Sequence, residues 1–128
     1  MSNDKIQGDR RFGAESMTAE RRTLVRHSCV LHITCHEIGG QPVDPWTTTV
    51  RDISEAGIGF VFNRAIEQGT FLVLEVPFPN ESFPRSLGAC VIHSTPRTEG
   101  GFAIGCVFDQ RLTPIDILAI LDANLLDL

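Results

Sequence analysis

The stretch WTTTVRDISEAGIGFVFN (residues 46–63) decides the fold. Its first part, WTTTVRDI, is rich in β-branched residues, its last part, GIGFVFN, alternates glycine with bulky apolar residues, and Ser-Glu-Ala lies between them. β-Branched and aromatic residues favour extended strands, and a short segment that contains serine and is followed by glycine favours a tight turn. The stretch therefore predicts two antiparallel strands, 46–53 and 57–63, joined as a hairpin.

Alternating polarity extends this pattern in both directions. From His27 the apolar side chains fall on one face and the polar ones on the other, which is typical of a half-buried strand, until a Gly-Gly-Gln-Pro turn at 39–42. The apolar face of this first strand consists of Cys29, Leu31, Ile33 and Cys35. Three further strands are predicted at 71–78, 85–95 and 101–109, with turn residues between them, among them Pro-Asn-Glu-Ser at 79–82.

The last segment, TPIDILAILDANLLDL (113–128), changes to helical spacing. Thr113 suits the N-cap, Pro114 the first helical position, and Asp116 lies three residues after the cap. The apolar stripe of this helix is expected to contain Ile117, Leu118, Leu121, Leu125 and Leu128. So much leucine also predicts a contact with a second copy of the chain, that is, a homodimer through the C-terminal helix.

Six short strands without helices between them predict an all-β fold, a closed six-stranded antiparallel β-barrel with a C-terminal α-helix that plugs or flanks it. A chain of 128 residues suits one domain. We expect a flexible N-terminal arm over 1–19 and one domain over 20–128, with the barrel at about 27–109 and the helix at about 114–127.

Composition argues against several classes of function. The net charge of −5 disfavours a surface for DNA or RNA, yet residues 1–26 hold six basic against four acidic side chains, so an anion would be drawn to the arm. The apolar runs are too short to insert into a membrane, and the N-terminus has no apolar segment of a secretory signal. We expect a soluble, cytoplasmic protein.

The chain shows no pattern of an enzyme or a metal protein. Its cysteines, Cys29, Cys35, Cys90 and Cys106, have no C-x-x-C spacing and are expected to be buried, reduced thiols. His32 and His36 would lie on the strand face opposite to Cys29 and Cys35, so one metal centre would need a bulge or outside ligands. We expect no catalytic residue, no metal and no cofactor.

Two short motifs suggest a binding site instead. ERRTLVR (20–26) contains three arginines, and Arg22 and Arg26 form an R-x-x-x-R pair. DISEAG (52–57) lies in the predicted hairpin, where Asp52 and Ser54 are expected to point outward beside exposed backbone amides and Gly57 is expected to take a positive φ. Taken singly, the first motif is a solvated basic arm and the second a good turn.

Together with an IGCVF strand at 104–108, these motifs resemble the PilZ domain family of cyclic di-GMP receptors. The resemblance covers roughly residues 20–110. It implies a six-stranded barrel whose arm closes over a dinucleotide held by the hairpin motif. The ligand-binding positions that it implies are Arg22, Arg26, Asp52, Ser54 and Gly57.

The chemistry of these residues suits that ligand. Arginine forks match both phosphates and the O6 and N7 edge of guanine, and Asp52 can accept from the guanine N1–H and N2–H₂ groups. Ser54 can donate to phosphate, and Gly57 leaves room for the ligand. We also hypothesise that Arg21 helps to hold a second, stacked ligand molecule.

The sequence therefore predicts a cyclic di-GMP receptor or adaptor that orders its arm on the ligand and signals through an unknown downstream protein. One alternative is a nucleotide-independent protein-interaction module that works through the C-terminal helix. Another is a barrel that binds single-stranded nucleic acid on its aromatic side chains. Most of those side chains alternate along the strands, however, and are expected to be core. The full set is Trp46, Phe60, Phe62, Phe71, Phe78, Phe102 and Phe108.

Overall fold

The computed structural model describes residues 24–39 and 44–126. Its elements are β2 (His27–Ile38), β3 (Trp46–Ile53), β4 (Gly57–Phe62), β5 (Phe71–Val76), β6 (Arg85–Pro96), β7 (Phe102–Phe108) and α2 (Pro114–Leu126). The six predicted strands and the helix are confirmed. The second strand has the predicted bounds, and the predicted ends of the others lie within two residues of those observed.

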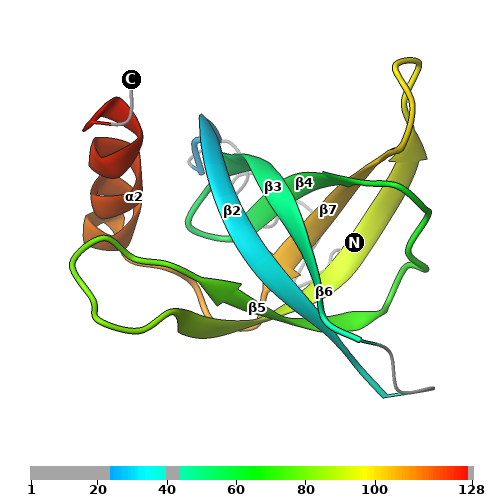
Figure 1. Ribbon diagram of the computed structural model, residues 1–128, viewed down its shortest axis with the longest axis horizontal. Coiled ribbons are helices and arrows are strands. Elements are labelled where there is room, and N and C mark those ends of the chain that lie inside the picture. The colour runs from blue at the N-terminus through cyan, green and yellow to red at the C-terminus, as the bar shows by residue number, and fades with distance from the viewer. Residues whose placement is uncertain (1–23, 40–43, 127–128) are drawn as a thin grey trace, which may run out of the picture.

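The strands close into one antiparallel barrel in the order β2-β3-β4-β7-β6-β5 (Figure 1). β3 and β4 pair as the expected hairpin, and β4 then pairs with β7. β2 is long enough to pair with β3 and, further along, with β5, which closes the ring. Closure leaves no unpaired sheet edge, so the fold is that of the predicted barrel.

The barrel interior is filled by apolar side chains from alternate strand positions. Ile33, Cys35, Val50, Phe60 and Leu74 are each at most 2% exposed. Trp46 stacks on Phe62 at the end of this core, with 3.9 Å between the ring centroids.

One aromatic residue departs from the predicted core. Phe71 is 58% exposed, because the inward positions of β5 are those of Leu72, Leu74 and Val76. Phe71 is therefore an exception to the expectation that most of the aromatic side chains are core.

Two β-bulges turn polar side chains to the outside. In β3, Val50 and Ile53 are both fully buried, and Arg51 is the extra residue between the pairs Val50–Phe60 and Asp52–Gly59. Asp52 would point inward in a regular strand, but the bulge turns it outward. β6 has a bulge of the same kind between Val91 and His93.

The bulge in β6 has the matching effect. Val91 is buried, Ile92 is the extra residue, and the side chain of His93 is exposed. In a strand of strict alternation His93 would share the inward face of Val91. The two bulges therefore place one carboxylate and one imidazole on the outer surface of neighbouring parts of the barrel.

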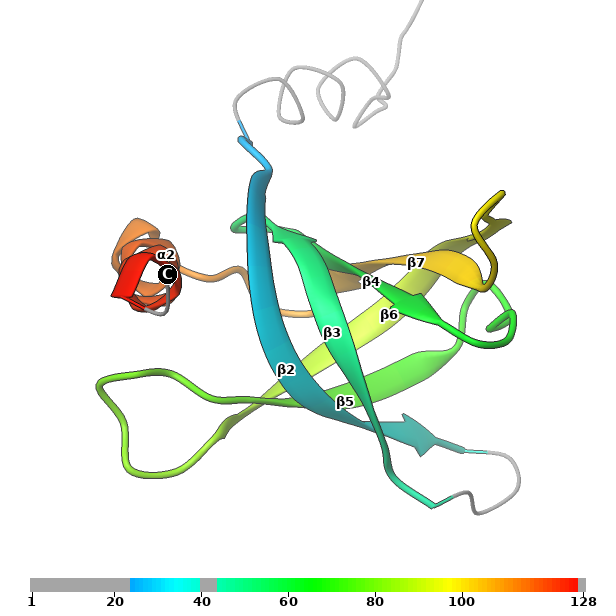
Figure 2. The same ribbon diagram turned by 45° about the horizontal axis from the view of Figure 1, so that its top comes forward.

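Helix α2 begins with the predicted cap. The Asp116 backbone N–H donates to Thr113 Oγ1 (3.1 Å), and the Thr113 N–H donates to Asp116 Oδ2 (3.0 Å). The helix flanks the barrel (Figure 2) and does not plug it, because the strands fill the interior with their own side chains. In the described part of the chain, no helix has the length and apolar character needed to cross a membrane.

The buried face of α2 differs from the predicted stripe. Ile117 and Ile120 are buried, whereas Leu118 is 58% exposed, so the inclusion of Leu118 was wrong. Leu121 is partly buried against the core. The side chains of Leu125 and Leu128 lie outside the described residues.

Candidate functional site

Arg26 and Asp52 meet on the outside of the barrel. Arg26 precedes β2, and its Nε donates to Asp52 Oδ1 at 2.9 Å, while Nη2 donates to the same oxygen. Both side chains are accessible, at 52% and 38% of their surface. The pair joins the two sequence motifs, which are 26 residues apart. An exposed ion pair of this kind stabilises a fold little, so its carboxylate and guanidinium remain available to a ligand.

Two glycines form the floor beside this pair. Asp52 pairs with Gly59 of β4, Gly59 with Gly105 of β7, and Gly105 with His93 of β6. A Cβ on Gly59 would lie 2.8 Å from Asp52 Oδ1, and one on Gly105 would lie 2.3 Å from His93 Nε2. Because Gly59 and Gly105 have no side chain, the Asp52 side chain can lie against the backbone of β4 and the His93 side chain against the backbone of β7.

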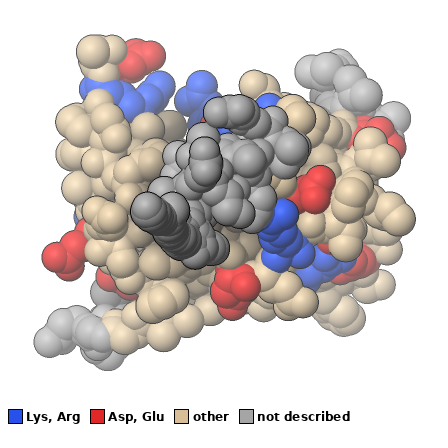
Figure 3. All heavy atoms as spheres, turned by 180° about the vertical axis from the view of Figure 1, so that it is seen from behind, with Lys and Arg blue, Asp and Glu red and all other residues tan. Residues whose placement is uncertain are grey.

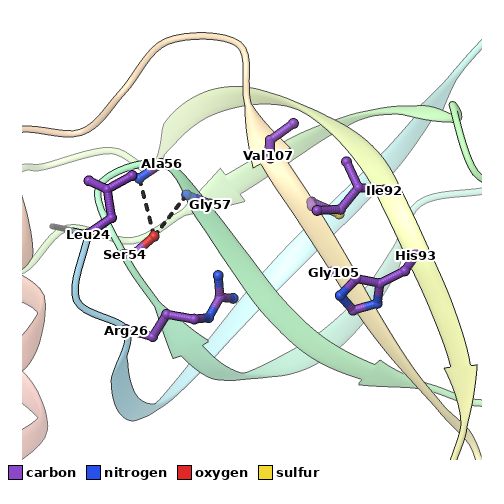
Figure 4. Close-up of a pocket in the computed structure, with 10 residues that line it drawn as sticks. Leu24, Arg26, Ser54, Ala56, Gly57, Ile92, His93, Gly105 and Val107 are labelled. Carbon is purple, nitrogen blue, oxygen red and sulfur yellow. Dashed lines mark hydrogen bonds between the residues drawn. The ribbon is translucent and has the colours of Figure 1, made fainter. Parts of the chain in front are cut away.

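The hairpin turn is held by its own hydrogen bonds. Ser54 is 2% exposed, and its Oγ accepts from the backbone N–H groups of Ala56 and Gly57, both at 3.2 Å (Figure 4). The Phe108 N–H also donates to the Ala56 carbonyl at 2.8 Å. The expectation that Ser54 points outward is wrong, because the hydroxyl is needed inside the turn. Its role here is to fix the shape of the motif.

Gly57 is required for a different reason from the one expected. Its φ is not among the positive values, which among the described glycines occur at residues 39, 69, 100 and 101. A Cβ on Gly57 would instead lie 2.2 Å from the backbone oxygen of Cys106. The glycine is therefore set by the close approach of β4 to β7, and the expected positive φ is wrong.

Two adjoining cavities open over this surface. One of about 220 Å³ is lined by Leu24, Ser54, Gly57 and Ile92, among others, and one of about 300 Å³ by Arg51, Asp52 and Gly59, among others. Both are also lined by Arg26, His93 and Gly105. Figure 4 shows Arg26 and His93 extending toward the first cavity from opposite sides.

The charge of the site differs from that of the whole chain. Among the described residues lining the two cavities, Arg26 and Arg51 are cationic and Asp52 is anionic, whereas the chain carries −5 overall. On the face shown in Figure 3, blue and red side chains lie side by side instead of forming one basic field. The positive charge is therefore local, which suits a small anion better than a nucleic-acid strand.

The thiol that lines the first cavity is protonated. Burial raises the pKa of Cys106 to about 12, and it raises those of Cys29 and Cys35 to about 11 and about 12. Neutral thiols are poor nucleophiles and poor metal ligands. Within residues 24–39 and 44–126, no group of three or more His, Cys, Asp and Glu side chains is placed to hold a metal ion.

The structure thus brings Arg26, Asp52, Ser54 and Gly57 together, while Arg21 and Arg22 lie outside the described residues. Sequence reasoning missed four residues of the site: Arg51, Gly59, His93 and Gly105. One signal was available for the bulge in β3. Val50 and Ile53, three residues apart, are both strongly apolar, which breaks strict alternation at Arg51 and Asp52.

Comparison with known proteins identifies the family and supports the fold. The sequence model of the PilZ domain matches residues 20–124. A search of curated proteins finds no match. PilZ domains are binding modules rather than a catalytic family.

Three solved structures share the fold. The Bacillus subtilis inhibitor of motility (MotI/DgrA) superimposes with a TM-score of 0.59 at 21% identity, over 79% of this chain and 48% of that one. The PilZ domain of Escherichia coli YcgR with c-di-GMP gives 0.51 at 14% identity, over 82% and 89%. The K. pneumonia MrkH–c-di-GMP complex gives 0.50 at 19% identity, over 84% and 51%.

This chain therefore spans about half the length of MotI/DgrA and of MrkH. Since the family model matches residues 20–124, which is most of the sequence, the chain belongs to the PilZ domain family.

Proposed function

We propose that this protein is a cyclic di-GMP receptor that binds the dinucleotide on the outer surface of β3, β4, β7 and β6. The observation that carries the proposal is the Arg26–Asp52 pair beside the floor of Gly59 and Gly105, between two cavities with local positive charge. Solved relatives with this fold, YcgR and MrkH, hold c-di-GMP.

The groups of the site complement those of the ligand. Cyclic di-GMP carries two phosphate charges, and its guanines offer O6 and N7 as acceptors to an arginine fork. Asp52 Oδ1 accepts from Arg26, and a carboxylate has further lone pairs for the N1–H and N2–H₂ donors of guanine. Arg26 faces the phosphates or a guanine edge, and Arg51 adds a second cation. Ser54 and Gly57 act by shaping the turn below the ligand.

The arm completes the proposal. Arg22, four residues before Arg26, is proposed as the second clamp, and Arg21 as a contact to a second, stacked ligand molecule. Ordering of the arm on the ligand would create a new surface for a downstream protein in the cytoplasm.

The exposed apolar side chains on α2 support output through this helix. Ile115 and Leu118 are 74% and 58% exposed, and Phe83 in the loop before β6 is 81% exposed. A partner protein, or a second copy of the chain in a homodimer, would cover these side chains.

Isothermal titration of the protein with cyclic di-GMP, with GTP as the control ligand, tests the proposal. We expect saturable heat with the cyclic dinucleotide and none with GTP, since GTP offers one guanine and a linear triphosphate in place of two guanines and two phosphodiesters. A stoichiometry of two ligands per chain would support the role of Arg21, and a stoichiometry of one would remove it. Absence of heat at high ligand concentration would overturn the receptor and leave a nucleotide-independent interaction module.

A further inference from the structure

The side chain of His93 lines both cavities of the candidate site. The bulge at Ile92 turns it outward, and its register partner is Gly105. An added Cβ on Gly105 would lie 2.3 Å from Nε2 and 2.5 Å from Cε1, so the far edge of the imidazole rests on the backbone of β7. Any side chain at position 105 would push the ring away. The exposed ring lies over this glycine and lines both cavities.

Among the residues that the structure describes, few charged groups line the same cavities as His93. Arg51 and Asp52 on β3 and Arg26 before β2 line the same cavities. The lining positions on β4 and β7 carry no charge, because they are apolar or glycine and because the raised pKa of Cys106 keeps that thiol neutral. Asp52 is already engaged by Arg26. A protonated His93 would thus add a cation that faces the ligand.

The hydrogen-bond acceptors of cyclic di-GMP favour the protonated form of His93. Neutral imidazole has one donor and one acceptor nitrogen, whereas both nitrogens of imidazolium donate. Phosphate oxygens and guanine O6 and N7 only accept. Hydrogen bonds from a charged donor are also about twice as strong as those from a neutral one. Protonated His93 therefore matches every acceptor that cyclic di-GMP could bring to this position.

We propose that His93 is a further ligand-contact residue that binds cyclic di-GMP in its protonated form, so that binding takes up a proton and tightens as the pH falls. The inference rests on the proposed function and adds a regulation of the same site. Histidine is the side chain whose charge changes between about pH 5 and 8. The arginines stay protonated over that range. Among the described residues that line the two cavities, His93 is therefore the one expected to cause a pH dependence in this range.

Titration calorimetry at about pH 6, 7 and 8, each in two buffers of different ionisation enthalpy, tests this inference. For the unchanged protein we expect affinity to rise about three- to tenfold from the highest to the lowest pH. The buffer dependence of the heat should show net proton uptake. His93→Gln keeps a planar polar side chain without the titration, so its affinity should be independent of pH and its proton uptake absent.

His32→Gln is the matched control. His32 is also exposed on a strand, bonds to Thr49 and lines neither cavity, so this variant should keep the full pH dependence. Saturable binding by the unchanged protein that does not vary with pH would overturn the role of His93 alone. The same is true if His93→Gln retains the proton uptake. No binding at any pH would overturn the proposed function itself.

Discussion

Arg26 and Arg85 both contact carboxylates, but the surroundings of the two side chains differ. Arg26 bonds to one oxygen of Asp52 on an open surface. Arg85 contacts Glu81 in the preceding loop and Asp116 of α2 (Nη1–Oδ2, 3.2 Å), and its guanidinium carbon lies 3.9 Å from the centroid of the Phe78 ring. Arg26 and Asp52 both remain accessible, whereas the Arg85 guanidinium is surrounded by Glu81, Asp116 and the Phe78 ring.

Charge separates the two regions as well. A cavity of about 390 Å³ adjoins Arg85, but Asp109 and Asp116 line it along with Arg85 and Arg111, so its charges balance. Hydrogen bonds, first that from the Thr113 backbone, hold the pKa of Asp116 below its usual value and keep it ionised. The cavities beside Arg26 hold two arginines and one carboxylate among the described lining residues. The described residues that line the cavities beside Arg26 therefore leave an excess of positive charge, which favours an anion, whereas those beside Arg85 do not.

Arg26→Ala should have the largest effect on binding. It removes charge-assisted hydrogen bonds, worth about 1.5–3 kcal/mol each, so the affinity for cyclic di-GMP should fall about 100-fold or more. The melting temperature without ligand should change by no more than about 4 °C, because an exposed ion pair contributes at most about 1 kcal/mol. Calorimetry and thermal denaturation measure the two quantities. If the ligand-free variant melts many degrees lower, Arg26 is structural and the comparison fails.

Arg85→Ala should show the reverse pattern. The variant loses the link between the loop and α2 and uncovers the buried Phe78 ring, so the free energy of unfolding should fall by about 1–2 kcal/mol. We use the lower part of the usual range because one third of the Arg85 side chain is exposed. Urea denaturation measures this loss. Ligand affinity should stay within about twofold of the unchanged protein, and a larger loss would place Arg85 in the ligand's reach.

Local patterns in the sequence were enough to predict most of the fold. Strand 46–53 follows from its β-branched residues, and the start of α2 follows from Thr113 and Asp116, whose hydrogen bonds lie within one turn. Each of these features depends on residues that are close in sequence. The prediction that Leu118 is part of the buried stripe was wrong, because the position of the barrel against the helix decides which helix face is buried.

The site was harder to predict because it depends on strand register. Asp52 and Arg26 were recognised from motifs. Gly57 was expected to serve a turn through a positive φ, whereas its actual requirement is the close contact with Cys106, 49 positions later in the sequence. His93 becomes part of the site only through the bulge at Ile92 and the absence of a side chain at Gly105. Neither can be read without knowing that β6 and β7 pair in this register.

Gly59→Ala should have the smallest effect and tests the glycine floor. The new Cβ would lie 2.8 Å from Asp52 Oδ1, which is the end of a flexible side chain, so the carboxylate should swing aside at little expense to folding. We expect affinity for cyclic di-GMP to fall about three- to tenfold, because the displaced Asp52 carboxylate would no longer be positioned to accept hydrogen bonds from Arg26 and guanine. Calorimetry measures the loss.

Gly88→Ala is the control from the other region, because its Cβ would displace the Asp109 carboxylate (2.4 Å) beside the charge-balanced cavity. The two substitutions make the same kind of collision, between a new methyl group and the tip of an aspartate. Only the one at Gly59 disturbs a carboxylate proposed to contact the ligand. Equal affinity losses in both variants would mean that general distortion of the barrel is responsible. No loss in Gly59→Ala would mean that the ligand does not depend on where Asp52 lies.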